Sequence, residues 1–318
     1  LERLALSFLI GCGLLTLEMF LLGTARIKLV LPNILIASAI ILVLPFYFGI
    51  KNKALTLDLK AWTKIEKFKW YELILSALIF AKIIFVFIEN LIKPVVGVDA
   101  FANWSFRAKA FFFDSGLLLN QKGDLFLGGG AVIYPLHIPL TETWIFNVLG
   151  YWNDALMKII FGLFFLVLIT IFYSSIRRVS SRPIAIFSTY LLTTLPLLVH
   201  HASIEYADFP LSVYFTASAL FLLNYFDSKS NRYLYLSAAL AGIATWTKSE
   251  ATPLLLINLI LLSIFYIKSK QELLPAAKNI FNCFMIVLIF KLPWSILNWV
   301  YHIPKSIYQN IEYEKVFA

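Results

Sequence analysis

Long apolar segments recur along the whole chain and constrain its fold more than any other feature. A helix that crosses a bilayer needs about 20 mostly apolar residues. Charged residues make up only 14% of the 318-residue chain, against about 25% in soluble domains. The sequence therefore predicts a membrane protein, and the candidate spans are 4–23, 32–50, 71–91, 155–173, 184–201, 209–226, 233–247, 253–267 and 280–300.

These segments are expected to be helical, because backbone groups in lipid have to satisfy their hydrogen bonds internally. We expect an all-α polytopic fold of about nine transmembrane helices, forming a single domain over residues 1–318. The segment 92–154 is then a large loop between the third and fourth helices. Within this loop, the sequence YPLHIPLTETWIFNVLG predicts a helix that lies in the membrane interface, with Trp144 at headgroup depth.

Lysine and arginine set the predicted orientation, because cytoplasmic loops carry an excess of both. The net charge of +9 is then explained by such loops, and we expect a bilayer rather than a nucleic acid as partner. The protein is predicted to be a multi-pass protein of the cytoplasmic membrane with an active site that faces outward. The basic stretches assigned to the cytoplasm are the 51–69 linker, RRVSSR, DSKSNR and KSKQELLPAAK, which leaves 92–154, 201–208, 248–252 and the tail from 301 outside.

The first cluster of polar residues is GVDAFANWSFRAKAFF, which begins at residue 97. Asp99, at the membrane boundary and tuned by partial burial, has the chemistry of a general base for an acceptor hydroxyl. Arg107 and Lys109 suit a phosphate, and Trp104 suits the face of a sugar. The alternative is a solvated loop with an interfacial tryptophan and cations that bind lipid headgroups.

Two further clusters fall on the same predicted face of the membrane. In HHASIEYADFPL, Glu205 and Asp208 share a helix face and suggest an acid–base pair or a metal site, although capping of two helix ends is the favoured alternative. In GIATWTKSEATP, Lys248 and Glu250 lie between two short apolar runs, where charged residues are costly and usually functional. The alternative there is a hairpin turn with a local ion pair.

Together with YPLHIPLTETWIF, these segments resemble the GT-C superfamily of integral-membrane glycosyltransferases. The nearest resemblance is to the dolichyl-phosphate-mannose protein mannosyltransferase-like group, glycosyltransferase family 39. The resemblance covers about 97–256 and implies an inverting transfer in which Asp99, in the first large outward loop, is the catalytic base. It also implies that Lys248, Arg107 and Lys109 meet the lipid phosphate. The residues that would contact the sugar or the acceptor are Trp104, His137, Glu205, Asp208 and Glu250.

The expected function is therefore transfer of a sugar from a polyprenyl-phosphate donor to a lipid, glycan or protein acceptor. A monophosphate donor needs no cofactor and no metal, whereas a diphosphate donor would bring in Mg²⁺ or Mn²⁺ at Glu205 and Asp208. A transporter or flippase of a lipid-linked or anionic solute is the alternative from another class, since it would use the same cations without a base. A non-catalytic assembly subunit of an envelope polysaccharide system is the third reading.

Overall fold

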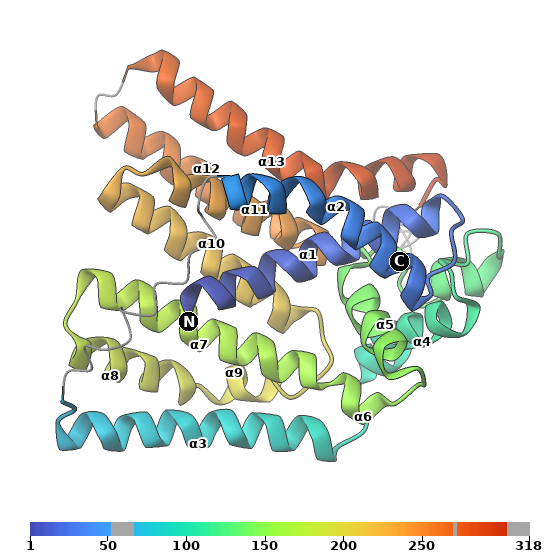
Figure 1. Cartoon of the computed structure of the whole chain (residues 1–318), viewed down its shortest axis with the longest axis horizontal. Coiled ribbons are helices and arrows are strands. Elements are labelled where there is room, and N and C mark those ends of the chain that lie inside the picture. The colour runs from blue at the N-terminus through green and yellow to red at the C-terminus, as the bar shows by residue number, and fades with distance from the viewer. Residues whose placement is uncertain (52–66, 270–271, 304–318) are drawn as a thin grey trace, which may run out of the picture.

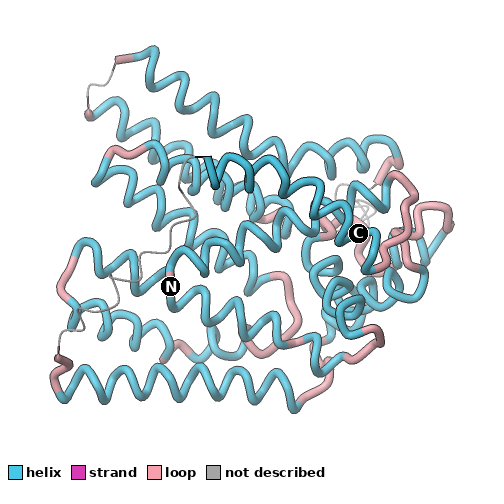
Figure 2. Tube along the Cα trace, viewed as in Figure 1, coloured by secondary structure: helices cyan, strands magenta, loops and turns pink. Residues whose placement is uncertain are grey.

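The computed structural model describes residues 1–51, 67–269 and 272–303, and these residues form helices and no strands (Figures 1 and 2). The all-α prediction is confirmed for this part of the chain. The helices longer than ten residues are α1 Glu2–Thr24, α2 Leu31–Lys51, α3 Trp70–Ile92, α5 His137–Leu149, α7 Ile159–Val179, α8 Arg182–Thr193, α10 Asp208–Ser228, α11 Asn231–Thr247, α12 Ala251–Lys268 and α13 Leu273–Val300. The shorter ones are η2 Ala100–Trp104, α4 Ser105–Asp114, η3 Gly123–Gly128, α6 Asp154–Met157 and α9 Pro196–His201.

Within the described residues, 7 helices are long and apolar enough to cross a membrane. They are α1, α2, α3, α7 with the preceding α6, α10, α12 and α13. The predicted multi-pass membrane protein is therefore confirmed, whereas the count of nine spans is not. The two predicted spans that fall short are α8, with 12 residues, and α11, with 17.

The predicted span 184–201 is divided by a proline. Leu195 adopts an extended backbone (φ −69°, ψ 112°), as the residue before a proline favours, and Pro196 starts the short helix α9. Helix α11 has a different character, because most of its residues are buried between α10, α13 and α1. A helix that is buried on all sides needs no lipid-facing stripe.

The long helices run back and forth between two ends of the molecule (Figure 1). At one end, Arg182 at the start of α8 binds Glu72 at the start of α3 with an Nη2–Oε2 distance of 2.8 Å. Arg178, near the end of α7, pairs there with Glu2 of α1. We call this the Arg182 end. The α7–α8 and α10–α11 connections and the facing ends of α12 and α13 lie at this end, on the left of Figure 1. They include described residues of three of the predicted cytoplasmic stretches. Residues 52–66 of the fourth stretch lie outside the described residues.

The opposite end holds η2, α4, η3 and α5, together with the connections α9–α10 and α11–α12 (Figure 1). We call it the Asp99 end. The helix predicted from YPLHIPLTETWIFNVLG is confirmed as α5, and its position in the membrane interface stays a prediction. His137, Glu142 and the residues between them are buried in the protein, because α5 packs against α1 and α4.

The orientation of the two ends gives a first testable prediction. Lys122 and Lys229 are both exposed, the first at the Asp99 end and the second in the α10–α11 connection. Single cysteines at these positions should react with a membrane-impermeant thiol reagent from opposite sides, Lys122→Cys in intact cells and Lys229→Cys only after lysis. Labelling of both in intact cells would overturn the predicted orientation.

Candidate active site

Three helix ends bring charged side chains together at the Asp99 end. Asp208 is the first residue of α10, Lys248 follows the last residue of α11, and Glu250 precedes the first residue of α12. The Lys248 Nζ atom lies 2.8 Å from Asp208 Oδ1 and 3.5 Å from Glu250 Oε1. An acid at a helix N-terminus and a cation at a C-terminus also match the helix macrodipoles.

Tyr134 lies beside Lys248, and the charge of Asp99 also acts on its hydroxyl. The Lys248 Nζ atom lies over the Tyr134 ring, 5.5 Å from its centroid. Burial raises the pKa of the Tyr134 phenol, and the carboxylates of Glu250, Asp208 and Asp99 raise it further. We call Asp99, Tyr134, Asp208, Lys248 and Glu250 the Tyr134 cluster. It contains three carboxylates and one ammonium, and its phenol stays protonated and able to donate a hydrogen bond.

Lys248 stays charged in this setting. Burial works against the charged form, but the hydrogen bond to Asp208 and the charges of Asp208 and Glu250 outweigh it and raise the pKa of Lys248. An ammonium has three donors. With one donated to Asp208 and another directed at Glu250, one remains for a ligand oxygen.

Asp99 precedes the π-helical turn η2 and is exposed, which corrects the expectation of partial burial. Its backbone N–H faces the Tyr206 hydroxyl oxygen at 3.4 Å. Gly97 makes this approach feasible, because a Cβ atom there would lie 2.4 Å from the Tyr206 ring. Single π-helical turns occur frequently at functional sites. The carboxylate of Asp99 is thus open to an incoming molecule while its backbone is held against the α9–α10 connection.

Trp104 ends the turn η2 and supports Tyr134 from behind. It is only 2% exposed, and its ring packs on the Tyr134 ring with centroids 5.2 Å apart and an interplanar angle of 38°. Asn103 adds a hydrogen bond from the Ala131 N–H to its Oδ1 atom at 3.1 Å. Trp104 therefore holds the cluster in place, and its buried face leaves little surface for a sugar.

Arg107 is fully buried one turn into α4 and lies behind Tyr134. Its guanidinium donates to three backbone carbonyl oxygens, those of Leu127 at 3.1 Å, Tyr134 at 3.1 Å and Ala131 at 3.5 Å. Burial lowers the pKa of Arg107 to about 9. These bonds fasten the loop that carries Tyr134 onto α4, so the structure does not bring Arg107 to the surface of the cluster.

Lys109 lies on another face of α4. Its Nζ atom sits 3.9 Å from the centroid of the Trp152 ring, the distance of a cation–π contact. Trp152 lies in the α5–α6 connection. Lys109 is therefore engaged away from the Tyr134 cluster, and its predicted contact with phosphate stays a prediction.

His137 is buried at the start of α5. Its Nδ1 atom lies 2.7 Å from Thr16 Oγ1 and its Nε2 atom 3.1 Å from the Tyr214 hydroxyl, which itself donates to the Leu9 carbonyl. Burial lowers the pKa of His137 to about 3, so the ring is neutral. It links α1, α5 and α10, and the structure does not bring it to the cluster.

Glu205 is also fully buried, and its carboxylate is bound by a lysine that the sequence analysis missed. The Nζ atom of Lys158 lies 2.5 Å from Glu205 Oε1, and both side chains are 0% exposed. Lys158 also donates to the Pro94 carbonyl at 3.3 Å. The pair joins the segment before Asp99 to the segment before Asp208 and so supports the cluster from beneath.

Glu142 of α5 lies near this buried pair. Its side chain is fully buried, with Ser105 and Glu205 nearby. Burial raises the pKa of Glu142 well above its ordinary value; a hydrogen bond with Ser105 opposes this shift and the Glu205 charge adds to it. Glu142 is therefore a neutral carboxyl in the protein interior.

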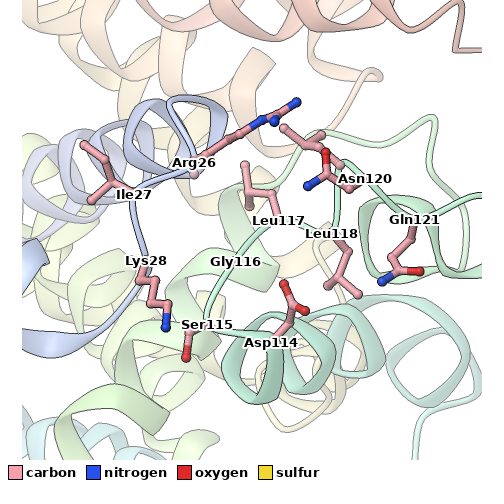
Figure 3. Close-up of a pocket in the computed structure, with 12 residues that line it drawn as sticks. Arg26, Ile27, Lys28, Asp114, Ser115, Gly116, Leu117, Leu118, Asn120 and Gln121 are labelled. Atoms are coloured by element: carbon pink, nitrogen blue, oxygen red, sulfur yellow. The ribbon is translucent and has the colours of Figure 1, made fainter.

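A polar pocket of about 210 Å³ opens beside the far end of α4 (Figure 3). Arg26 and Lys28 of the α1–α2 connection line it together with Asp114, the last residue of α4, and Gln121 of the segment that follows. The Leu29 N–H donates to the Ser115 carbonyl at 2.7 Å and ties the two segments together. Because Asp99 and Trp104 precede the other end of α4, this pocket is separate from the Tyr134 cluster.

Of the predicted site residues, the structure thus brings together Asp99, Asp208, Lys248 and Glu250. Tyr134 joins them unpredicted, although it is the first residue of YPLHIPLTETWIF, one of the segments that carry the family resemblance. No group of three or more His, Cys, Asp or Glu side chains in the described ranges is placed to hold a metal ion. Freedom from cofactors and metals therefore stays an expectation.

These features define a class: a multi-pass helical membrane protein with a charged cluster at one end of its bundle. A sequence model of the family described as Dolichyl-phosphate-mannose-protein mannosyltransferase matches residues 135–297, just over half of the chain. The chain therefore belongs to this family of membrane glycosyltransferases, which use sugars linked to polyprenyl phosphates. Searches of curated proteins and of solved structures each gave no match.

The matched segment includes Asp208, Lys248 and Glu250 of the Tyr134 cluster and the buried pair Lys158–Glu205. It begins one residue after Tyr134, so Asp99 precedes it. The family assignment and the role of Asp99 thus depend on different observations.

Proposed function

We propose that the protein transfers a sugar from a polyprenyl-phosphate donor to an acceptor on the outer side of the cytoplasmic membrane. The donor's tail dissolves in the bilayer, so its sugar has to react at the lipid boundary. The acceptor is a lipid, a glycan or a protein. Family membership supports the reaction class, and the site at a single end of the helical bundle supports the location.

Asp99 is the proposed base. It takes the proton of the acceptor hydroxyl while that oxygen attacks the anomeric carbon of the sugar. The bond between this carbon and the phosphate oxygen breaks with its electron pair on the phosphate, and the configuration inverts. An exposed carboxylate suits this task, since it meets the acceptor from solution.

Lys248 is the proposed partner of the donor's phosphate. Its third ammonium donor stabilises the negative charge that builds up on the leaving phosphate oxygen, and the Tyr134 hydroxyl is a second donor. Asp208 and Glu250 hold Lys248 in place and offer acceptors for sugar hydroxyls. For Arg107 and Lys109 we propose supporting roles, since their cationic groups are already engaged.

A single observation carries the proposal: Lys248 and Tyr134 lie together with Asp208 and Glu250 at the end of the bundle where Asp99 is also exposed. The deciding experiment incubates the purified protein with a radiolabelled sugar on polyprenyl phosphate and a membrane extract as acceptor source. Transfer of label to a new product supports the proposal. Movement of the intact donor across vesicle membranes without transfer would favour a flippase.

Lys248→Ala gives a second testable prediction. A charge-assisted hydrogen bond contributes about 1.5–3 kcal/mol, so the affinity for the donor should fall roughly 10- to 150-fold. Folding should change little, because Asp208 and Glu250 are 44% and 51% exposed and such ion pairs contribute about 0–1 kcal/mol.

The measurement is the donor concentration at half-maximal transfer, with Lys122→Ala as a matched control from an exposed loop at the same end. Lys248→Arg should retain most of the affinity because it keeps the charge. Unchanged donor affinity in Lys248→Ala would reduce Lys248 to a helix-end ion pair.

A further inference from the structure

Lys291 is a cation inside a membrane-spanning helix. It lies on α13, and its Nζ atom donates to the Thr252 hydroxyl at 3.3 Å. No carboxylate of the described residues lies within ion-pair distance of it. A charge in a span is costly and usually functional, and it is normally paired. Within the part of the chain that the structure describes, Lys291 thus lacks the anionic partner that its position calls for.

An apolar cavity of about 560 Å³ begins at Lys291. It follows α13 as far as Ala277, a distance of about 20 Å at the rise of an α-helix. Its walls come from α10, α11, α12 and α13, and the lining is almost wholly hydrocarbon. The exposed side chains of Leu259, Phe281 and Phe284 border it, so it opens toward lipid between α12 and α13.

The end of this cavity at Lys291 lies next to the candidate active site. Thr252, the partner of Lys291, follows Lys248 by four residues. The connecting turn is tight, with the Ala251 N–H bonded to the Lys248 carbonyl at 3.2 Å. Lys291 is therefore located just on the membrane side of the Tyr134 cluster.

The charges of the Tyr134 cluster also favour a phosphate site at Lys291. Two carboxylates, those of Asp208 and Glu250, flank Lys248, so a phosphate monoester bound by Lys248 alone would meet net negative charge. Arg107 is buried against backbone carbonyls and Lys109 lies over Trp152, so neither presents its cationic group to a phosphate at the cluster. Among the described residues that border the site, Lys291 is a cation with no acidic partner.

We propose that Lys291 and this cavity bind a polyprenyl monophosphate, with the phosphate at Lys291 and the first isoprene units in the cavity. The proposal rests on the proposed function and deepens it. The chain would leave the protein through the opening between α12 and α13, and the sugar would extend from the phosphate toward Asp99. A long apolar cavity with one cation at its end matches a single hydrocarbon chain with one anionic head.

Binding to the full chain in detergent micelles tests this proposal, with geranylgeranyl phosphate as the charged probe and geranylgeraniol as the neutral one. Lys291→Ala should weaken binding of the phosphate roughly 10- to 150-fold and leave binding of the alcohol unchanged. Lys291→Arg should rescue the phosphate affinity. Leu288→Trp, which fills the cavity wall near Lys291, should weaken both probes. Lys278→Ala, at an exposed position of α13, is the matched control.

Equal affinity of wild type and Lys291→Ala for geranylgeranyl phosphate would overturn the proposal, and Lys291→Gln repeats the test should the alanine variant fail to fold. Displacement of the probe by phosphatidylglycerol at equal concentration would also overturn it, because the site would then accept any anionic lipid. Binding that depends on Lys291 in a protein without sugar transfer would support the lipid site and refute the glycosyltransferase.

Discussion

Replacement of Asp99 by asparagine should lower sugar transfer by about 10²- to 10⁴-fold, the usual contribution of a positioned general base. Asparagine keeps the size of the side chain but does not take up a proton. The variant should fold normally, because Asp99 is exposed and its structural contact is made by its backbone N–H. Donor binding should also persist, since the proposed phosphate contacts come from Lys248 and Lys291.

The informative measurement is single-turnover transfer of labelled sugar together with the dissociation constant of the donor. Asp124→Asn, an exposed acid of the same segment, should retain wild-type turnover. A transporter would give another pattern, because transport needs no base and the asparagine variant would have no transfer to lose. Turnover near that of wild type in Asp99→Asn would remove Asp99 from the mechanism.

Much of the helical framework could be predicted because lipid allows few alternatives. Apolar segments of membrane length have to be helices, and most of their bounds agree with the structure to within a few residues. The segment 184–201 is divided into α8 and α9 because Pro196 lies within it, a signal that apolar composition alone does not contain. In α11 the apolar residues pack against other helices, and hydrophobicity alone does not distinguish protein neighbours from lipid.

The candidate site was predictable where charges lie in the turns between helices. Asp208, Lys248 and Glu250 sit at helix ends, and ends that alternate along the chain must meet at the same end of a bundle. His137 and Arg107 were different, because their roles depend on which face of a helix packs inward. Both side chains proved to be fully buried, a result of packing among α1, α4, α5 and α10 that local sequence does not encode.

The role of Lys158 also could not be predicted from local sequence, since there it is a single cation at the start of an apolar segment. The structure pairs it with Glu205 in the protein interior, and this gives the second large expected effect. Lys158→Met should destabilise the protein by about 3–5 kcal/mol, because it leaves the Glu205 carboxylate buried without a partner. Lys93→Met removes a partly exposed ion pair with Glu89 and should cost only about 0–1 kcal/mol.

Unfolding in mixed micelles of detergent and denaturant compares these variants. The double variant Lys158→Met/Glu205→Gln should recover most of the lost stability, because no unpaired charge remains in the interior. If Lys158→Met costs no more than Lys93→Met, the buried pair does not hold the fold. In the recovered double variant, sugar transfer should still be reduced, because the pair joins the Pro94 segment before Asp99 to the segment before Asp208. Full transfer would instead mean that packing alone positions these two carboxylates.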